Sequence, residues 1–520
     1  MKTILFSFIF CLMSACLIAQ SGTLDSSFGV NGVVYNNNKG VINQIVLQHN
    51  GKIITGGAGG TIKNPFLLAR YNSDGSVDSS FGKNGNAGTN ELSEVFAMTV
   101  QNDDKIVAFG HDAYLKLVRY KSDGRVDSSF GTAGIVNTSV GIGADVPVGI
   151  VTQPDNKIIS GGYIINLPNE QRQGYLIRYL NNGSLDTNFG DSGKVIFNTP
   201  DANSAIDIVT AIALAPNNKI IVSLSYVSSL QARAYRFNTD GIIDSSFGIN
   251  GRAEFQSQTG LFNSLQVTDI VVQPNGKIIG CGTVSMDNNI FKGNISISCL
   301  NKDGSIDSSF GNNGLAYAAF GQNASTCKSV LLQKDGKIIS LGSEYSLDYT
   351  RTYFALTRFT SVGKIDSTFG NDDLQTTQAG NQDYLSSAAL QHDGKILSGG
   401  NSGPNDVLIR YNNDALSKKQ IIITKIKHYI QTHNNANAVS KLATISLYPN
   451  PVNNLLSIKG LDAIYNYELL MMNDKGAIIK QASANNISSY QFNVQNLSSG
   501  VYYVSVISNG KTFTTLKFVK

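Results

Sequence analysis

The sequence is poor in charge, in glutamate, in proline and in tryptophan. Only 15% of its 520 residues are charged, Pro occurs ten times and Trp does not occur. The 37 acidic residues divide into 31 Asp and six Glu. Because Asp favours turns and Glu favours helices, this imbalance argues against a helical protein. A hydrophobic content of 42% excludes a disordered chain, and a net charge of +4 indicates no polyanionic partner such as nucleic acid.

Cysteine and histidine are also scarce, with five of each, which excludes a scaffold framed by disulfides or metal ions. Apart from Cys11 and Cys16 near the start, the cysteines are Cys281, Cys299 and Cys327, so at most one disulfide can form. We find no nucleophile elbow, no zinc-binding His-Glu-x-x-His, no Cys-x-x-Cys pair and no phosphate-binding loop. No residue is therefore predicted to be catalytic, to bind a cofactor or to ligate a metal. The histidines are interpreted as solvated loop residues: His49, His111, His392, His428 and His433.

Long hydrophobic runs are missing, and no stretch is long enough for a transmembrane helix. Residues 1–19 begin with one basic residue, continue with a short apolar run and end in small residues, the pattern of a secretory signal peptide. We predict cleavage after Ala19. The alternative is a lipoprotein signal, in which Met13-Ser14-Ala15-Cys16 would present Cys16 for lipidation.

The charge changes sign near residue 417. Residues 20–416 contain 29 basic and 34 acidic residues, whereas residues 417–520 contain 11 and 3, a net of +8. Residues 417–442 include the polar, patternless stretch 432–441 and are predicted to be a linker. Residues 443–520 alternate apolar and polar residues between turns, which predicts a small β-sandwich.

Three segments of this C-terminal region carry a family resemblance. The sequences Ser446-Leu-Tyr-Pro-Asn-Pro-Val452, Leu497-Ser-Ser-Gly-Val-Tyr-Tyr-Val504 and Leu516-Lys-Phe-Val-Lys520 resemble the type A sorting domain of the type IX secretion system. The resemblance implies that the type IX machinery recognises residues 443–520 and exports the protein across the outer membrane of a gram-negative bacterium. The protein would then be secreted or attached to the outer cell surface, with the domain removed on arrival.

The region between the two ends is a sevenfold repeat with a period of about 57 residues. Three motifs recur in a constant order. Asp-x-x-Phe-Gly begins at Asp25, Asp78, Asp127, Asp186, Asp244, Asp307 and Asp366. A turn followed by Lys-Ile is centred on Lys52, Lys105, Lys157, Lys219, Lys277, Lys337 and Lys395. Arg followed by an aromatic residue occurs at Arg70, Arg119, Arg178, Arg236, Arg358 and Arg410, with Cys299 in the fifth place.

Each repeat contains four short alternating runs and no helix pattern. In the third copy these runs cover residues 147–153, 157–163, 175–179 and 194–197. Four antiparallel strands per repeat are typical of a propeller blade. The pattern resembles the delta-60 repeat family of β-propellers over residues 24–416. We therefore predict an all-β chain, with a seven-bladed β-propeller at residues 20–416, a linker and a small C-terminal β-sandwich.

Loop lengths distinguish the two faces of the predicted propeller. Eleven residues separate the Arg (or Cys299) from the Phe in all six measurable copies, whereas the Lys-to-Arg spacing varies between 14 and 22 residues. The connections of constant length share one face, the constant face, and the variable loops share the opposite one, the variable face. Because binding residues concentrate on variable loops, we predict the ligand site on the variable face. Tyr163 and Tyr345 are candidates there for stacking on sugars, or are scattered partly buried residues.

The repeated residues are interpreted as scaffold, since seven identical positions do not mark one asymmetric site. The motif Asp is predicted to pair with the motif Lys and Arg inside each blade, with a calcium site as the alternative. The motif Phe is predicted to pack between blades, and the Gly to supply turns with positive φ.

The ring is predicted to close through the run at Val33, which would supply the strand that the seventh repeat lacks after Arg410. The competing candidate is the segment at residues 420–426.

Two hypotheses for function remain. The first is a secreted or surface binding, adhesion or scaffolding propeller with an unknown extracellular glycan or protein ligand. The second is a secreted hydrolase or lyase acting on a polysaccharide or protein. An enzyme predicts two carboxylates, or a His and a carboxylate, converging in one pocket on the variable face. A binding protein predicts aromatic and amide side chains there.

Overall fold

The computed structural model falls into two compact units, Met1–Asp414 and Ala415–Lys520. The residues it describes are 20–36, 40–61, 64–65, 68–90, 92–111, 114–141, 143–166, 171–198, 207–226, 232–255, 264–285, 293–320, 323–370, 373–414, 445–450, 452–459, 461, 466–474, 478–485, 488–508 and 511–520. The predicted signal peptide, the predicted linker at 417–442 and the segment at 420–426 lie outside these residues.

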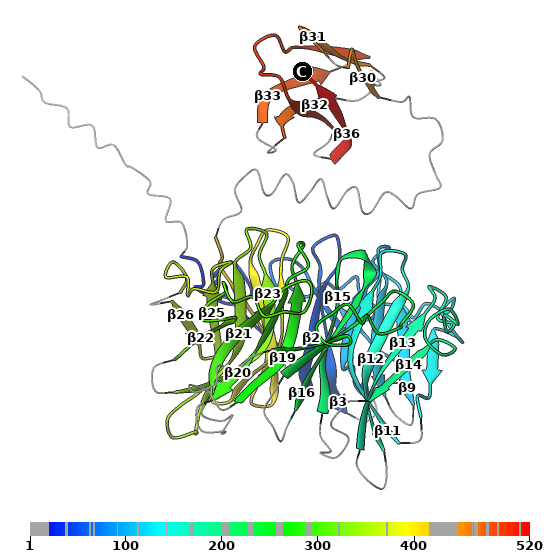
Figure 1. The fold of residues 1–520 in the computed structure, drawn as a ribbon, viewed down its shortest axis with the longest axis vertical. Coiled ribbons are helices and arrows are strands. Elements are labelled where there is room, and N and C mark those ends of the chain that lie inside the picture. The colour runs from blue at the N-terminus through cyan, green and yellow to red at the C-terminus, as the bar shows by residue number, and fades with distance from the viewer. Residues whose placement is uncertain are drawn as a thin grey trace, which may run out of the picture. The chain divides into compact units, whose positions relative to one another are not determined.

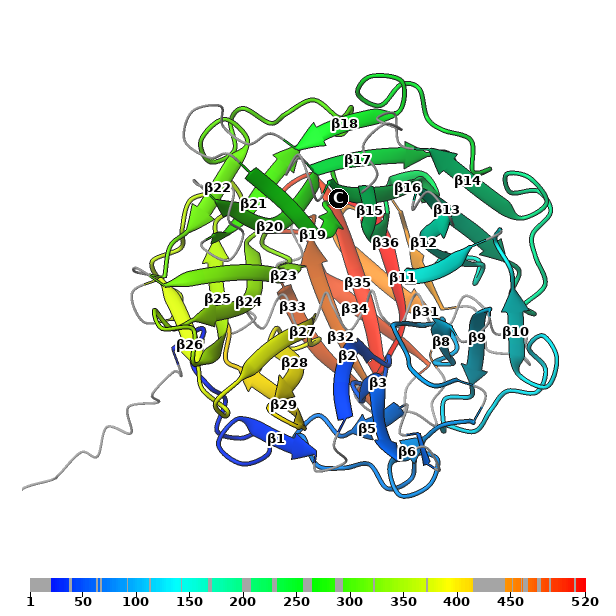
Figure 2. The ribbon, with the colours of Figure 1, turned by 90° about the horizontal axis from the view of Figure 1, so that it is seen from below.

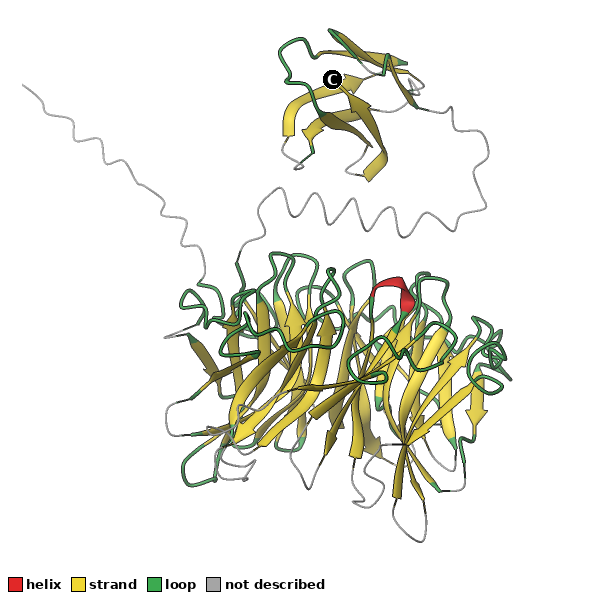
Figure 3. Ribbon diagram, in the orientation of Figure 1, coloured by secondary structure: helices red, strands yellow, loops and turns green. Residues whose placement is uncertain are grey.

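The first unit is a ring of seven antiparallel sheets, which confirms the seven-bladed propeller. Figure 1 shows the blades from the side, and Figure 2 shows β11, β15, β19, β23 and β27 near the centre with β10, β14, β18, β22 and β26 at the rim. The one helical segment among the described residues is the 3-10 turn η1 (Pro216–Asn218), drawn in red in Figure 3.

The strands follow the chain from the centre of each blade to its rim. Blade 1 contains β2 (Gly40–Leu47), β3 (Ile53–Thr61), β5 (Leu68–Tyr71) and β6 (Asn86–Ala87), with β4 (Asn64–Pro65) beside β3. Blade 2 contains β7 (Ala97–Val100), β8 (Ile106–His111), β9 (Leu115–Tyr120) and β10 (Ile135–Thr138). Blade 3 contains β11 (Ala144–Thr152), β12 (Ile158–Asn166), β13 (Gln171–Tyr179) and β14 (Lys194–Asn198). Blade 4 contains β15 (Asp207–Leu214), β16 (Ile220–Tyr226), β17 (Ala232–Phe237) and β18 (Arg252–Phe255).

The remaining blades repeat this order. Blade 5 contains β19 (Ser264–Val272), β20 (Ile278–Ser285), β21 (Asn294–Leu300) and β22 (Leu315–Ala318). Blade 6 contains β23 (Ala324–Leu332), β24 (Ile338–Tyr345), β25 (Thr352–Phe359) and β26 (Leu374–Thr377). Blade 7 contains β27 (Asp383–Leu390), β28 (Ile396–Ser402), β29 (Asn405–Tyr411) and β1 (Val33–Asn36).

The strands of blade 3 extend beyond the predicted runs. The hairpin of β12 and β13 continues its pairing out to Asn166 opposite Gln171. These terminal residues are polar and break the alternation on which the prediction rested. Backbone hydrogen bonds extend the hairpin where no side-chain pattern marks it.

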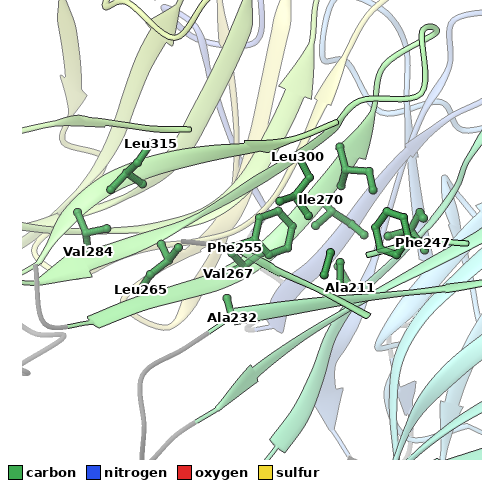
Figure 4. Close-up of a cluster of buried hydrophobic side chains, with 14 residues drawn as sticks. Ala211, Ala232, Phe247, Phe255, Leu265, Val267, Ile270, Val284, Leu300 and Leu315 are labelled. Carbon is green, nitrogen blue, oxygen red and sulfur yellow. The ribbon is translucent and has the colours of Figure 1, made fainter. Parts of the chain in front are cut away.

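Hydrophobic side chains fill the spaces between neighbouring blades. Figure 4 shows the cluster between blades 4 and 5, where Phe247 and Phe255 meet Leu265, Val267 and Ile270 of β19. Phe247 is the motif Phe of its blade and is fully buried. Its ring also lies against the next blade, because a Cβ on Gly304 would come within 3.0 Å of two ring carbons. The prediction that the motif Phe packs between blades is confirmed, and Gly304 has the predicted positive φ of 90°.

Strand β1 closes the ring, as predicted. It pairs antiparallel with β29, with Val34 opposite Leu408 and Tyr35 opposite Val407. Val33 is buried in the core of blade 7 together with Val407 and Ile409. Blade 7 thereby gains its fourth strand. Closure covers the sheet edges that an open ring would expose.

A fully buried carboxylate, Asp406, lies at this seam. It occupies the second position of β29, opposite Asn36 of β1, and a Cβ on Gly40 of blade 1 would lie 3.1 Å from its Oδ1. Burial raises the pKa of Asp406 to about 7. The unfolded chain therefore loses this proton near pH 4 and the folded chain near pH 7, so stability falls as pH rises through that interval.

We expect Asp406→Asn to raise the free energy of unfolding at pH 8 by about 2 kcal/mol, and to leave it nearly unchanged at pH 4. Each pKa unit corresponds to about 1.4 kcal/mol, and the amide retains part of the desolvation cost. Urea unfolding at the two pH values measures the effect. An equal effect at both pH values would contradict the assignment.

The second unit contains two sheets. One has the order β30 (Ser446–Tyr448), β31 (Leu455–Lys459) and β34 (Ser489–Asn493). The other has the order β33 (Ile478–Asn485), β32 (Asn466–Asn473), β35 (Val501–Ser508) and β36 (Lys511–Val519). One buried cluster joins Leu456, Ile458 and Phe492 of the first sheet to Leu469 and Val504 of the second. The two sheets pack face to face as the predicted β-sandwich.

Candidate functional site

The constant face carries one ion cluster in each blade. In blade 4, Asp244 Oδ2 lies 2.6 Å from both Lys219 Nζ and Arg236 Nε. The same carboxylate oxygen meets the motif Lys and Arg in five other blades, and in blade 5 Asp307 meets Lys277 alone. The other oxygen accepts hydrogen bonds from the residue two positions later, such as Ser246. The predicted ion pair inside each blade is confirmed.

The seventh cluster unites the two ends of the propeller. Asp25 precedes β1, yet its Oδ2 lies 2.7 Å from Arg410 Nε and also contacts Lys395 Nζ. Burial alone would raise the pKa of Asp25, but the hydrogen bonds from Lys395 and Ser27 and the charge of Arg410 lower it to about 2. The cluster therefore holds β1 in place with charge as well as with backbone pairing.

One position of each repeat, outside the three motifs, lines the central channel of the propeller. In six blades the innermost strand has a β-bulge nine residues before the motif Lys. The bulge turns the side chain of this residue toward the channel. The preceding residue, ten positions before the Lys, is buried between blades. The seven residues at this position, here called the channel ring, are Asn43, Phe96, Val148, Thr210, Thr268, Lys328 and Ser386.

The channel ring lines a cavity of about 450 Å³. Glu94 and Tyr163 also line this cavity. They lie on the side of the channel ring that faces away from the constant-face turns. A second cavity of about 270 Å³ continues from the ring toward Gln44, Asp269 and Ser387. The ring contributes an amide, an aromatic ring, an aliphatic group, three hydroxyls and one ammonium group.

Lys328 is the one charged residue of the channel ring, and its side chain is exposed to the channel. Asn43 donates hydrogen bonds of 2.8 Å to Glu94 Oε1 and of 2.9 Å to the Val95 carbonyl. Phe96 lies with its ring centroid 5.2 Å from that of His111. Chemically, the channel can place a cation, an aromatic face and several hydrogen-bonding groups around one ligand.

The residues next to the channel ring hold neighbouring blades together. The backbone N–H of Met98 donates to Gln44 Oε1 at 2.6 Å, that of Val330 to Asp269 Oδ2 at 3.0 Å and that of Ile45 to Ser387 Oγ at 3.0 Å. Each bond joins one blade to the next. The ring is thus held on a fixed frame, which favours a binding site of constant shape.

The structure separates the aromatic residues that the sequence singled out. Tyr163 lines the channel cavity, with the guanidinium carbon of Arg172 5.5 Å from its ring centroid. Tyr345 ends β24 and is half-buried near Tyr349, with 6.3 Å between the ring centroids.

The histidines lie in three places. His49 and His392 occupy constant-face turns, where a hydrogen bond with Asp104 raises the pKa of His49 and burial lowers that of His392. His111, expected in a loop, ends β8 beside Phe96. His428 and His433 lie outside the described residues.

The carboxylates of the channel are engaged in hydrogen bonds to the protein. Glu94 accepts from Asn43, and Asp269 accepts from Ser329 and the backbone of Val330. Cys281, Cys299 and Cys327 are buried free thiols. Sequence reasoning missed the channel ring, although its constant distance of nine residues from the motif Lys was a signal that could have revealed it.

The fold and these contacts define the class, a seven-bladed β-propeller followed by a β-sandwich. Residues 446–520 match the family "Secretion system C-terminal sorting domain". Residues 48–81, 101–130, 153–189 and 273–310 match the family "Domain of unknown function (DUF5122) beta-propeller". The chain thus carries a type IX sorting domain behind a propeller of delta-60-like repeats, as the two resemblances implied. None of the curated proteins matches the sequence.

Solved structures show distant likeness. PorZ, an essential surface component of the type IX secretion system of Porphyromonas gingivalis, has 14% identity and a TM-score of 0.36 over 96% of this chain and 60% of its own. The extracellular domain of a two-component system of B. thetaiotaomicron has 12% identity and a TM-score of 0.39 over 94% of this chain and 57% of its own. An endo-arabinase of B. thetaiotaomicron has 7% identity and a TM-score of 0.32, with 62% and 93% covered.

This chain therefore spans less than two thirds of the length of the first two structures. Sequence identities of 7–14% and TM-scores below 0.4 carry no function to this chain. The sorting domain itself implies a secreted or cell-surface protein. Among the described residues, no helix is long and apolar enough to cross a membrane.

Proposed function

We propose that this protein is an exported binding protein that recognises an extracellular glycan or protein at the central channel of its propeller, from the variable face. The observation that supports this function is the channel ring. At this position the blades carry six different residue types, whereas the motif Lys and Asp are the same in all seven. A scaffold needs the same residue in each blade, and recognition of an asymmetric ligand needs different ones.

The proposed localisation rests on the two ends of the chain. The predicted signal peptide at residues 1–19 would direct entry into the periplasm, and residues 443–520 would engage the type IX machinery. The mature propeller would then be released or held at the outer cell surface of a gram-negative bacterium.

The test is an array of neutral and acidic oligosaccharides and extracellular proteins, probed with the exported propeller. We expect Lys328→Ala and Phe96→Ala each to weaken binding of the ligand found by tenfold or more, since both side chains line the channel cavity. The matched control is Lys364→Ala, which removes an exposed lysine from a constant-face turn. A ligand whose affinity changes with none of the channel variants would refute the channel as the site.

A further inference from the structure

Two cysteines face each other across the junction between blades 5 and 6. Cys281 belongs to β20, the second strand of blade 5, and Cys327 belongs to β23, the innermost strand of blade 6. Both lie in one buried cluster, where Cys281 is 0% and Cys327 2% exposed. The two thiols are within hydrogen-bond distance of each other. Their sulfur atoms are therefore neighbours although the residues come from different blades.

Hydrogen bonds between the blades hold this pair in place. Thr268 Oγ1 lies 3.8 Å from Cys281 Sγ and donates a bond of 3.0 Å to the backbone carbonyl of Cys327. The backbone N–H of Cys327 donates to Thr283 Oγ1 at 3.3 Å. Because Thr268 and Thr283 belong to blade 5, these two bonds fix the backbone of Cys327 beside the strand that carries Cys281.

The repeat places the same two positions opposite each other at another junction. Cys281 stands four residues after the motif Lys of its blade, and Cys327 stands ten residues before that of its own blade. Between blades 7 and 1, these positions are occupied by Gly399 and Ile42. A Cβ on Gly399 would lie 3.2 Å from the Ile42 side chain. The propeller itself therefore brings side chains at these positions into contact.

The third buried cysteine, Cys299, has other surroundings. It lies opposite Ile279 in the register of blade 5, whereas Cys281 lies opposite Ile297. Its Sγ is 3.7 Å from Asp307 Oδ2, in the ion cluster of the constant face. Cys299 is thus a control for the pair within the same blade.

We propose that Cys281 and Cys327 form a disulfide bond that joins blades 5 and 6 when the protein folds in an oxidising compartment. Disulfides form and persist in the periplasm and outside the cell, and the sorting domain implies a secreted or cell-surface protein. The oxidant is a protein or a small molecule that itself carries a disulfide.

The reaction is a thiol–disulfide exchange in two steps. The thiolate of one cysteine attacks the disulfide of the oxidant and releases one thiol. The other cysteine then attacks the mixed disulfide and releases the second thiol. The protein gives up two electrons and two protons, and the oxidant leaves as two thiols.

Burial determines when this bond forms. Burial raises the pKa of the Cys281 thiol well above its ordinary value, and only the thiolate attacks a disulfide. The bond therefore forms while blades 5 and 6 assemble, before the pair is enclosed. Once enclosed, it is shielded from reductants and fixes β23 beside β20 at the residue preceding Lys328 of the channel ring.

The experiment refolds the reduced full-length protein in buffers of graded oxidised-to-reduced glutathione. The remaining thiols are blocked with N-ethylmaleimide, and the peptides are mapped by mass spectrometry. We expect a cross-linked peptide pair containing Cys281 and Cys327, at least tenfold more abundant than any cross-link to Cys299. Since the buffer supplies the oxidant, the result depends neither on export nor on a ligand in the channel.

Two variants make the mapping specific. Cys299→Ala should leave the cross-link unchanged, and Cys281→Ala should leave Cys327 blocked by maleimide. Maleimide on both Cys281 and Cys327 of the wild type in the most oxidising buffer would overturn the proposal, as would a predominant cross-link to Cys299.

Urea unfolding provides a second readout. A cross-link between residues 46 positions apart restricts the unfolded chain, so the oxidised wild type should unfold at a higher urea concentration than the reduced one. Cys299→Ala should retain this difference between its oxidised and reduced forms, and Cys281→Ala should lose it. Comparison of two redox states of the same variant removes the effect of the substitution on packing. Equal unfolding midpoints of oxidised and reduced wild type would contradict a bond between the blades.

Discussion

Replacing Asp25 by alanine is expected to lower the free energy of unfolding of the propeller by about 3 kcal/mol. The change leaves Arg410 buried and Lys395 partly buried without their common carboxylate, and removing one partner of a buried ion cluster costs about 3–5 kcal/mol. We expect the lower end of this range because the Lys395 side chain is 29% exposed, so water can still solvate its ammonium group. Chemical unfolding at pH 7 measures the effect.

The pH dependence gives this prediction a second readout. The pKa of Asp25 is lower in the folded chain, so its contribution is complete above pH 4 and is lost as pH falls toward 2. The wild type and Asp25→Ala should therefore converge in stability at acid pH. The matched control is Asp123→Asn, which removes an exposed ion pair with Arg125 and should leave the stability unchanged. Equal effects of the two substitutions at pH 7 would show that the Asp25 cluster does not hold the ring closed.

Deleting residues 443–520 is expected to abolish export and leave a folded propeller in the periplasm. The sorting-domain match begins at residue 446, and the buried core of the sandwich contains no propeller residue. Fractionation of cells and medium, with circular dichroism of the retained protein, measures both outcomes. Leu455→Ser changes an exposed residue of β31 and should be exported like the wild type. Release of the truncated protein at the wild-type level would refute the assignment of the export signal.

Most of the propeller was predictable because its repeats combine local signals. The Asp-Gly turns, the alternation of the strands and the constant spacing between Arg and Phe each recur seven or six times, so one irregular copy does not hide the pattern. The closing strand at Val33 was predictable for a related reason, since the seventh repeat lacks the connector that precedes a fourth strand. Strand ends were predicted less well, as at Asn166, because backbone pairing there needs no hydrophobic side chain.

The candidate site was less accessible to sequence reasoning. The channel ring depends on a β-bulge, which reverses the side-chain alternation at one residue, and no residue type marks that bulge. The presence of Cys299 where the other repeats have arginine was visible in the sequence, and in the structure it leaves Asp307 paired with Lys277 and without an arginine.

The pairing of β1 with β29 also sets the order in which the chain can fold. Val34 and Leu408 are 374 positions apart, so β1 has no partner until blade 7 has been made. Blades 1 to 6 can form from neighbouring residues, whereas the ring closes last and through the longest loop in the domain. Until that moment, one sheet edge remains free, and a chain halted partway through secretion would present that edge to other unfinished chains.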